Sequence, residues 1–395
     1  MKQVISTEKK PIKLWLDDIE NGALDQAKNL ANLPFTFKHV ALMPDAHQGY
    51  GMPIGGVFAT NNVIVPNAVG MDIGCGICAV KTSIRGSLDQ ETLRRIIGGS
   101  KEYPGGIRSS VPVGFSHHSK KQNDCHMPRL HEKDTPIAAQ EYESALKYVG
   151  TLGGGNHFIE IQKGSDGYIW LMVHSGSRAM GAKVAQHYNH LANAANRLWN
   201  SEVPKKWELA FLPINSDHGT QYMNEMQYCV KFAFANRLLI MQRVMDAVTA
   251  ILPRTRFATE INVAHNYAAI EHHYDANVVV HRKGATRARN GEWGIIPGSQ
   301  GTKSYIVTGK GNPESFTSCS HGAGRVLSRT KAIKTLNFDA ERALLDDQGI
   351  IHNMNSSKSL DEAPGAYKDI TAVMANQEDL VNIAVELTPL AVIKG

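Results

Sequence analysis

Residues 69–83 read VGMDIGCGICAVKTS, a glycine-rich turn followed by an apolar run. Asp72 and Cys75 stand three residues apart in the turn, and Gly74 between them allows a sharp change of backbone direction. The run from Ile77 to Ser83 is typical of a β-strand. The stretch therefore predicts a strand preceded by a carboxylate and a thiol that can both reach one metal ion.

Strand-like and helix-like segments continue on both sides of this turn. Gly55 to Pro66, centred on Asn61-Asn62, predicts a β-hairpin, and Gly98 to Asp134 lacks periodicity and predicts a long surface excursion. Further strands are expected at Tyr168–Val173, Ile261–Ala264, Val278–His281 and Ser304–Thr308, and helices at residues 136–149, Met180–Trp199, Thr220–Leu252 and Ala363–Ala375. With no repeat and no linker, the pattern predicts one α+β domain over residues 1–395, with mixed β-sheets, flanking helices and sites at strand ends.

The longest of these helices carries apolar side chains spaced by three and four residues. We expect this stripe to be plain core, because such spacing places the side chains on one face of a helix. Its members are Met226, Val230, Phe234, Leu238, Met241, Met245 and Val248.

The composition excludes several classes of protein. With 395 residues, of which 42% are hydrophobic and 20% charged, the chain can bury a large core and is not disordered. The formal net charge of +5 permits a polyanionic partner without requiring one. No apolar run reaches the roughly 18 residues of a membrane-spanning helix, and five cysteines are too few for a disulfide scaffold. We therefore expect a cytoplasmic protein with reduced thiols and no membrane partner.

Histidine is frequent, with 17 copies, many of them in short glycine-containing clusters. His157, His174, His265 and His281 each stand at or near the end of a strand-like or glycine-turn segment. One such histidine is more often a structural hydrogen-bonding residue, but four beside an Asp-x-x-Cys turn favour metal ligation. Imidazole, carboxylate and thiolate suit a divalent ion such as Mn, Fe, Co or Zn, and they suffice for two ions. A two-metal site is typical of displacement at phosphorus.

Cys75 and Cys78 also form a Cys-x-x-Cys motif, which is typical of a redox pair or of half a zinc site. No second Cys-x-x-Cys occurs, and no thioredoxin-like βαβ pattern surrounds this one. The redox interpretation therefore remains as the less favoured alternative.

A second candidate loop, TSCSHGAGR, runs from Thr317 to Arg325. Gly322 and Gly324 let backbone amides approach an anion closely, and Arg325 can form paired bonds to phosphate. His321 can act there as a ligand, a general acid or a nucleophile on phosphorus, and the structural alternative is a helix-entry turn. The chain contains neither a P-loop nor the dinucleotide-binding fingerprint, so any nucleotide would be held by an unusual site.

Several longer motifs occur in a fixed order along nearly the whole chain. They are MPDAHQG at 43–49, VGMDIGCG at 69–76, GGGNHFIE at 153–160, HSGSR at 174–178, HN at 265–266, HRKGAT at 281–286 and SHGAGR at 320–325. In this order they resemble the RtcB family of RNA ligases. The resemblance implies that family's single α+β domain around a deep central metal cleft.

The resemblance also implies an activity and the residues that carry it. The protein would join RNA 3′-phosphate or 2′,3′-cyclic phosphate ends to 5′-hydroxyl ends, using GTP and two Mn²⁺ ions, in tRNA splicing or RNA repair. His321 would take GMP and pass it to the RNA 3′-phosphate, and the 5′-hydroxyl would then expel GMP. Cys75 would bridge the two ions, with His157 on one and Asp72, His174 and His265 on the other. The implied GTP-binding positions are Asn156, His157, Glu160, His265, Asn266, Pro297, Gly298, Ser299, Gln300, Ser304, Gly322, Ala323, Gly324, Tyr367 and Lys394, and the basic residues near the phosphates are Arg178, Lys283 and Arg325.

Two other functions and two substrates stay open at this point. A two-metal phosphohydrolase acting on RNA ends would use the same ligands with water as the nucleophile, and an RNA-end-binding module would hold a metal without turnover. The RNA partner is either tRNA halves or cleaved ribosomal RNA, because some RtcB-like proteins accompany a release-factor homologue thought to serve ribosomal RNA repair. The need for an archease-like activator is likewise left open.

Overall fold

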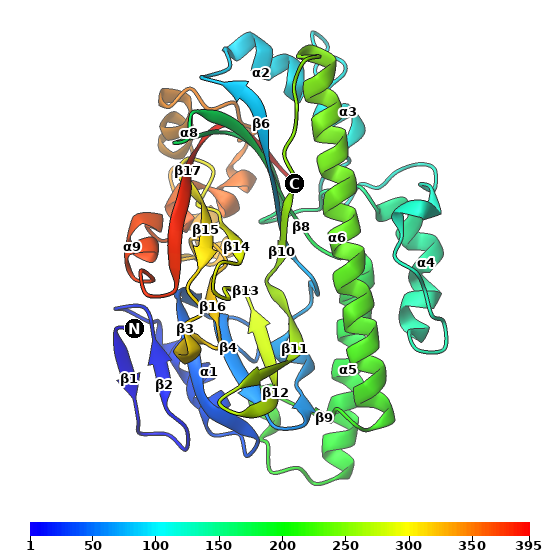
Figure 1. Ribbon diagram of the computed structural model, residues 1–395, viewed down its shortest axis with the longest axis vertical. Helices are drawn as coiled ribbons and strands as arrows, with labels where there is room; N and C mark the ends of the chain where they lie inside the picture. The colour runs from blue at the N-terminus through cyan, green and yellow to red at the C-terminus, as the bar shows by residue number, and fades with distance from the viewer.

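The computed structural model covers Met1–Gly395 and is built on two large β-sheets with helices packed around them (Figure 1). One sheet has six strands in the order β1-β2-β3-β4-β12-β11, and the other has seven in the order β10-β6-β8-β7-β17-β15-β14. β2 and β3 pair in parallel, whereas neighbours such as β3 and β4 or β6 and β8 pair antiparallel. Mixed sheets with flanking helices confirm the α+β fold class predicted from the sequence.

The strands and helices have the following bounds. The six-stranded sheet comprises β1 (Gln3–Ile5), β2 (Ile12–Leu14), β3 (Thr36–His47), β4 (Ile54–Thr60), β12 (Ala276–Lys283) and β11 (Asn266–His273). The seven-stranded sheet comprises β10 (Ile261–Ala264), β6 (Gly76–Arg85), β8 (Tyr168–Ser175), β7 (Phe158–Gly164), β17 (Val381–Lys394), β15 (Ser304–Gly309) and β14 (Trp293–Ile296). Two small sheets pair β13 (Ala285–Arg287) with β16 (Ser318–Ser320) and β5 (Val63–Ile64) with β9 (Leu212–Pro213). The helices are α1 (Asn21–Ala31), α2 (Gln90–Ile97), α3 (Ile107–Ser110), α4 (Pro136–Tyr148), α5 (Arg178–Leu198), α6 (Asp217–Ile251), α7 (Arg329–Thr335), α8 (Phe338–Asp347) and α9 (Ile370–Ala375).

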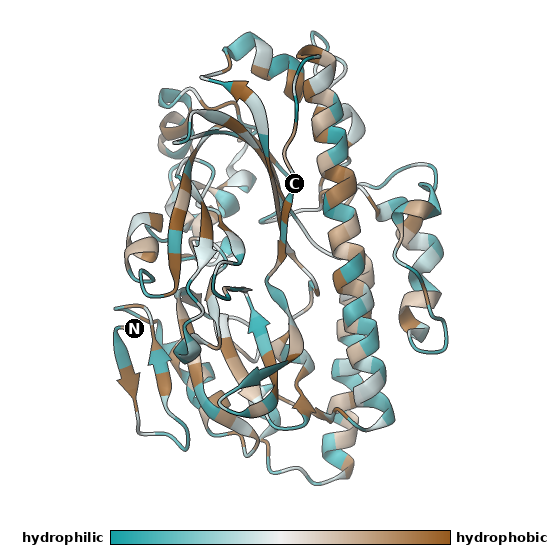
Figure 2. Ribbon diagram, in the orientation of Figure 1, coloured by the Kyte–Doolittle hydropathy of each residue, from teal (hydrophilic) through white to brown (hydrophobic).

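The central strand β8 shows why the seven-stranded sheet is buried on both faces. Because side chains alternate along a strand, Leu171 and Val173 join the apolar cluster that includes Ile240 of α6. Trp170 and Met172 point the other way and pack with residues of β14 and β15. Figure 2 shows apolar residues along these strands and along α6. Each fully buried large apolar side chain contributes about 1.5–3 kcal/mol to folding. Helix α6 therefore stabilises one face of the sheet, and the sheet's own strands β14 and β15 pack against the other face.

Helix α6 is the longest element and runs along one side of the molecule (Figure 1). The Ser216 side chain accepts a hydrogen bond from the Gly219 amide at 3.1 Å and caps the helix, which therefore begins three residues before the predicted Thr220. The predicted core stripe is wrong at Leu238, which is 40% exposed, because the buried face is rotated toward Phe232 and Val244. No helix combines the length and the apolarity needed to cross a membrane.

Two predicted elements differ in the structure. The hairpin at Gly55–Pro66 is wrong, because β4 pairs with β3 and β12 while β5 pairs with β9. The turn at Asn61-Asn62 is present, with Asn62 at φ 56°, but β5, the strand that follows it, belongs to another sheet. The helix predicted at Ala363–Ala375 is divided into a 3-10 turn at Pro364–Ala366 and α9. The segment Gly98–Asp134 is largely irregular, as predicted, with only α3 and one further 3-10 turn.

The strand register brings distant parts of the sequence to one end of the seven-stranded sheet. Gly76 at the start of β6 pairs with Ser175 at the end of β8 and with Ala264 at the end of β10. The residues next to these positions in the chain are Cys75, His174 and His265. The expectation of a site at strand ends is therefore confirmed.

The close contact between β6 and β10 generates a test of this register. A Cβ on Gly76 would lie 2.0 Å from the carbonyl oxygen of Val263, so Gly76→Ala must push the two backbones apart. We expect a loss of about 2 kcal/mol or more in the free energy of unfolding, measured by urea denaturation. Gly105→Ala is the matched control, because nothing lies within 4 Å of a Cβ there. Equal unfolding midpoints for the two variants would contradict the register.

Candidate active site

The Asp72–Cys75 turn is fixed from three directions at the start of β6. Gly74 has φ 75°, and a Cβ there would lie 2.7 Å from the Cα of Val230, so the turn packs directly on α6. The Gly74 amide donates to the carbonyl of Asn266 at 2.7 Å, and Arg237 donates to the carbonyl of Gly74 at 2.8 Å. Glycine is therefore required by both the backbone conformation and the close approach of the helix.

Five potential metal ligands meet around this turn. The Cys75 Sγ atom lies 3.4 Å from His157 Nε2 and 3.3 Å from His174 Nε2, and the ligand atoms of these three residues lie within 4.8 Å of one another. Asp72 Oδ2 lies 3.1 Å from His157 Nε2. The His265 ring centroid is 5.2 Å from that of His174, and the His265 amide donates to the Cys75 carbonyl at 2.8 Å. The predicted ligands are thus brought together, although His265 and Asp72 lie outside the tightest group.

The polar atoms of this cluster fit a bound cation. The buried Nδ1 atom of His265 has no hydrogen-bond partner, and such an orphaned atom requires an explanation that a metal ion would supply. His174 Nδ1 pairs with the carbonyl of Asn156 at 3.1 Å, which fixes its ring and leaves Nε2 for a ligand role. One thiol, several imidazoles and one carboxylate are donors that divalent transition metals accept.

Protonation in the cluster also suits metal binding. Burial lowers the pKa of His174 and of His265 well below the usual value, so both imidazoles are neutral and can ligate without losing a proton. Burial and the neighbouring Asp72 raise the pKa of the Cys75 thiol well above its usual value. Burial alone would raise the pKa of Asp72 too, but the hydrogen bond and charge of His157, the hydrogen bond from Cys75 and the charge of Arg178 together outweigh it, and the pKa is lowered. A cation would favour the thiolate, because a coordinating thiol is deprotonated by the metal charge.

His321 stands beside this cluster with one ring nitrogen engaged. Its Nδ1 lies 2.6 Å from Oδ2 of the fully buried Asp45, and the same oxygen accepts from the amides of His321 at 3.0 Å and Gly322 at 3.3 Å. The His321 and His265 ring centroids are 4.7 Å apart. A Cβ on Gly324 would lie 2.2 Å from the Asp45 carbonyl oxygen, so this glycine lets the loop close over the carboxylate. Nε2 is therefore the ring nitrogen left for chemistry.

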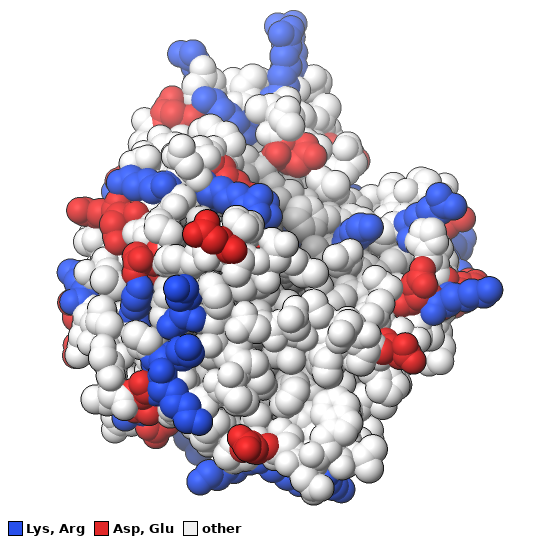
Figure 3. All heavy atoms as spheres, turned by 60° about the horizontal axis from the view of Figure 1, so that its bottom comes forward, with Lys and Arg blue, Asp and Glu red and all other residues white.

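A cavity of about 610 Å³ opens between these residues, which is large enough for a nucleotide. Besides the metal donors, its walls include the predicted nucleotide-binding and catalytic positions Asn156, Glu160, Asn266, Lys283, Pro297, Gly298, Ser299, Gln300, His321, Gly322, Ala323, Gly324, Arg325, Tyr367 and Lys394. Charged side chains on the outer surface in Figure 3 are of mixed sign, with a broad central area that carries none. The cavity wall also carries basic side chains suited to an anionic ligand, among them Lys283, Arg325 and Lys394.

Two titratable side chains in the cavity have unusual environments. Burial lowers the pKa of Lys283 to about 7, while its Nζ donates to the carbonyls of Tyr50 at 2.6 Å and Asn67 at 2.9 Å. Burial raises the pKa of Glu160 to about 8, against the opposing effects of the Lys394 charge and a hydrogen bond from Gln162 at 2.6 Å. Perturbed groups in a cavity are typical of functional sites.

Glu362 is a further cavity residue that the sequence analysis missed. Its carboxylate is 4% exposed and receives Lys394 Nζ at 3.0 Å, Arg325 Nη1 at 3.1 Å and the Tyr367 hydroxyl. Arg329 Nε lies 3.4 Å away. Three predicted residues are therefore arranged around one carboxylate. The only sequence signal was its position beside Ala363-Pro364, which does not distinguish a site residue from a turn.

Asp45 was also missed, although it stands in the MPDAHQG motif. An acidic residue in that motif gives no sign that its partner would be His321, which is 276 positions away. The partnership appears only when β3 and the loop after β16 meet in three dimensions.

Three predicted site residues do not line the cavity wall. His157 lies behind Cys75 within the metal cluster, and Ser304 lies behind the Pro297–Gln300 loop, where its hydroxyl accepts from the Gly298 amide at 3.2 Å. Arg178 begins α5 and donates to the Thr151 hydroxyl at 3.2 Å and to the Gly114 carbonyl at 3.0 Å. Its guanidinium therefore joins the loops beside the site.

Two sequence interpretations are overturned by the structure. His281, grouped with the metal candidates, lies in the core, accepts from the Val65 amide at 3.0 Å and stacks on Phe58. The redox interpretation of Cys75 and Cys78 is also wrong, because the two thiols lie in different surroundings, with Cys75 against the imidazoles of His157 and His174. Cys78 packs in the apolar cluster between the sheet and α6, and burial raises the pKa of its thiol to about 12.

A thiol and imidazole donor set beside an oriented histidine, in a cavity of this size, is typical of an enzyme active site with a candidate metal site. Residues 26–395 match the family described as tRNA-splicing ligase RtcB. The chain is 36% identical to RNA-splicing ligase RtcB of Escherichia coli K12, over 100% of this chain and 99% of that protein. It is 32% identical to tRNA-splicing ligase RtcB of Thermococcus kodakarensis, over 95% and 92% of the two chains. The chain therefore belongs to the RtcB ligase family.

The donor cluster generates a prediction about metal content. Cys75→Ala removes the central thiol, so we expect the variant to remain folded but to lose at least about tenfold in Mn²⁺ affinity, measured by calorimetry. Cys78→Ala should keep the affinity and lose about 1 kcal/mol of stability, because it removes only a core sulfur. Equal losses of metal affinity in both variants would contradict the assignment.

Proposed function

We propose that this chain joins RNA 3′-phosphate or 2′,3′-cyclic phosphate ends to 5′-hydroxyl ends, with GTP as the activating nucleotide and Mn²⁺ in the donor cluster. The observation that supports this proposal most directly is the His321–Asp45 pair, which presents one imidazole nitrogen to a nucleotide-sized cavity next to the candidate metal site. Membership of the RtcB family supports RNA as the substrate and tRNA splicing or RNA repair as the setting. Residues 1–395 act as one domain in this proposal, and the cytoplasm is its location.

His321 is the nucleophile in the first step. Its Nε2 attacks the α-phosphorus of GTP, an N–P bond forms, and the P–O bond to pyrophosphate breaks so that pyrophosphate leaves. Asp45 accepts the Nδ1–H hydrogen bond, which holds the ring in the required tautomer and stabilises the positive charge that develops on it. In the next step the 3′-phosphate of the RNA attacks the same phosphorus, the N–P bond to His321 breaks and GMP passes to the RNA end; a 2′,3′-cyclic phosphate must first be opened by water to a 3′-phosphate. The 5′-hydroxyl then attacks the RNA phosphorus and expels GMP.

The metal donors of this proposal are Asp72, Cys75, His157, His174 and His265. When bound, two Mn²⁺ ions would neutralise charge on the phosphate oxygens. The cluster holds the phosphates close to His321, because the His265 ring contacts both the cluster and the nucleophile. Lys283, Arg178 and Arg325 are proposed to stabilise the phosphates of nucleotide and RNA.

The guanine base is proposed to bind at the opposite side of the cavity. Glu160 and Lys394 both line it, and they offer an acceptor and a donor to a base edge that carries both kinds of group. Tyr367 would lie against the base, with its hydroxyl donated to Glu362. The loop Pro297–Gln300 and residues Gly322–Gly324 approach one another across the cavity wall and are proposed to enclose the nucleotide there.

The two-metal phosphohydrolase is the less favoured alternative. It would activate water at the same ligands and would need no nucleophilic side chain. The His321–Asp45 pair would then have no task in the reaction, although three hydrogen bonds to one carboxylate oxygen fix its geometry.

Covalent labelling tests the proposed function. Wild-type protein with Mn²⁺ and α-labelled GTP should retain label after denaturation, whereas His321→Ala should retain none, because the N–P bond cannot form. ATP should label far less than GTP. The adduct should be labile in acid and stable in base, as a phosphoramidate is. Label that persists in the Ala variant would exclude His321, and RNA dephosphorylation without any label would favour the hydrolase.

The raised pKa of Glu160 predicts a pH dependence of GTP binding. Guanine presents N–H donors, so the ionised carboxylate binds it better than the neutral acid. Since the pKa is about 8 in the nucleotide-free protein, the competent form grows as pH rises, and GTP affinity should increase by at most about tenfold between roughly pH 7 and pH 9. Glu160→Gln should bind more weakly and lose this increase. Calorimetry on both proteins cancels the titration of GTP itself, and identical pH profiles would contradict the role.

A further inference from the structure

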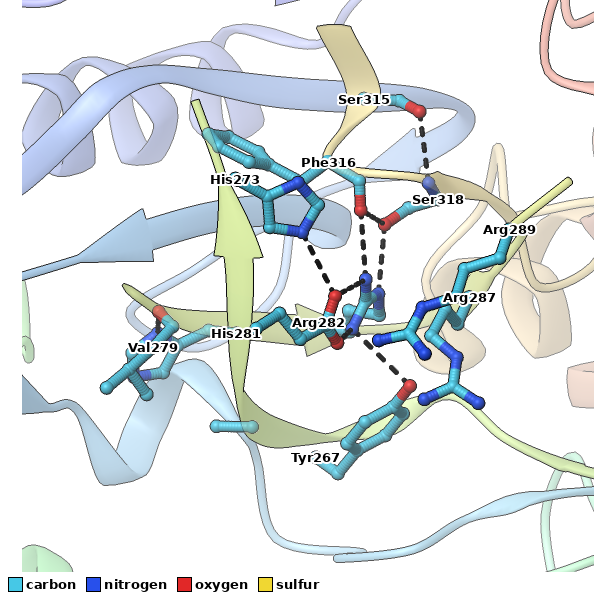
Figure 4. A network of polar contacts seen from close by, with 12 residues as sticks. Tyr267, His273, Val279, His281, Arg282, Arg287, Arg289, Ser315, Phe316 and Ser318 are labelled. Atoms are coloured by element: carbon cyan, nitrogen blue, oxygen red, sulfur yellow. Dashed lines mark hydrogen bonds and ion pairs between the residues drawn. The ribbon is translucent and has the colours of Figure 1, made fainter. Parts of the chain in front are cut away.

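A buried ion network lies on β11 and β12, beside the active site but outside the cavity (Figure 4). Arg282 is 0% exposed, and its two terminal nitrogens bind both carboxylate oxygens of Glu271, at 2.5 Å and 3.0 Å. His273 Nε2 lies 3.1 Å from the same carboxylate. The carboxylate holds the guanidinium in one orientation, so that its remaining donors point to a neighbouring segment.

Those remaining donors bind the segment that leads to the proposed nucleophile. Arg282 donates from Nη2 to the Phe316 carbonyl at 2.9 Å and from Nε to the Ser318 hydroxyl at 2.9 Å. Figure 4 shows the Arg282 guanidinium next to Phe316 and Ser318 of this segment. A planar guanidinium can bind a carboxylate and a backbone carbonyl at once, which a lysine ammonium cannot do with the same geometry.

The bound segment contains a strained turn. Phe316 and Thr317 have φ 50° and 48°, a left-handed conformation that is costly for bulky and β-branched residues. The Phe316 ring is fully buried, stacks on His39 at 4.5 Å and meets His273 edge-on at 5.4 Å. The Thr317 hydroxyl is buried without a partner. A glycine would adopt this conformation without strain, whereas Phe316 and Thr317 adopt it at a cost in free energy. The surrounding contacts therefore impose the turn.

The turn is connected rigidly to His321. The Thr317 carbonyl accepts from the Ala288 amide at 2.7 Å, and β16 follows at once, paired with β13. At the end of β16, Ser320 binds Gln377 through both its amide and its hydroxyl. His321 is the next residue, so a shift of the turn moves the start of the nucleophile loop.

We propose that Arg282, oriented by Glu271, is a positioning residue that holds the Phe316–Thr317 turn and thereby sets the imidazole of His321 against the metal cluster. The inference rests on the proposed function, in which His321 takes the nucleotide. Stability alone does not account for the arrangement, since a buried ion pair and a strained turn both cost free energy and apolar replacements are often as stable. The ion pair and the strained turn both lie close in the chain or in space to the segment that leads to His321, and the position of His321 determines the rate of the proposed first step.

The test separates positioning from stability by relieving the strain. Thr317→Gly removes the left-handed penalty and the unpartnered hydroxyl, so the melting temperature should stay equal or rise. Single-turnover labelling at saturating Mn²⁺ and GTP should nevertheless slow by at least about fivefold, because the loop loses its fixed start. Arg282→Lys should slow labelling by at least about tenfold, with the KM for GTP within about twofold of wild type. Asn200→Gly is the matched control, since Asn200 has φ 49° at the exposed end of α5. This change should leave the labelling rate unaltered.

The outcomes are distinguishable. Labelling of Thr317→Gly at the wild-type rate, or a rate loss accompanied by a matching fall in melting temperature, overturns the positioning role. A loss that appears only in the KM for GTP also overturns it. If Arg282→Lys fails to fold, Thr317→Gly still decides. Absence of label in the wild-type protein overturns the proposed function and this inference together, whereas normal label in wild type and both variants overturns this inference alone.

Discussion

The guanidinium of Arg237 is the interaction on which the arrangement of the active site depends. It is fully buried at the middle of α6 and donates to the carbonyls of Gly74 at 2.8 Å and Ser175 at 2.9 Å and to the Asn262 side chain at 2.7 Å. These acceptors belong to the three segments that carry Cys75, His174 and His265. Burial lowers the pKa of Arg237 only to about 10, so the group stays charged at neutral pH and each bond is charge-assisted.

The neighbouring residue extends the same role to a fourth segment. Asn236 accepts from the amides of Gly150 and Thr151 and donates to the carbonyls of Thr151 and Gly176. One turn of α6 therefore fixes both the glycine-rich loop before His157 and the strand end that carries His174. The apolar faces of α6 and β8 pack against each other. The hydrogen bonds of Asn236 and Arg237 fix the register between the helix and the strand.

The electrostatics of the cavity divide into two halves. On the metal side, burial keeps the imidazoles of His174 and His265 neutral, and the combined effects of His157, Cys75 and Arg178 keep Asp72 ionised. On the far side, Glu362 gathers the cations of Lys394 and Arg325, while Glu160 is left largely protonated. In the proposed function, cations held by the donor cluster would offset the phosphate charge on the metal side, while Glu160 and Lys394 would offer hydrogen-bonding groups to the base.

The sequence predicted those elements that are encoded by neighbouring residues in the chain. Glycine turns, apolar runs and the motifs around Cys75, His174 and His321 are contiguous, so they predicted the strand-end site and the α+β class. The pairing of β5 with β9 was not predictable, because a turn at Asn61-Asn62 looks the same whether the next strand returns or leaves. Two features depend on tertiary contacts, namely the contact of Asp45 with His321 and the cluster of side chains around Glu362. No spacing pattern in the sequence predicts them.

The donor cluster is assembled from residues far apart in the chain, with Cys75 separated by 82 positions from His157 and by 99 from His174. Contacts of such long range form late, since the loops between them must first be closed at an entropic cost. A partly synthesised chain therefore offers scattered single donors, and the complete donor set exists only once both sheets are in place. In the proposed function, a metal ion would consequently bind after the chain has folded, and the ions available at that stage would compete for the completed donor set.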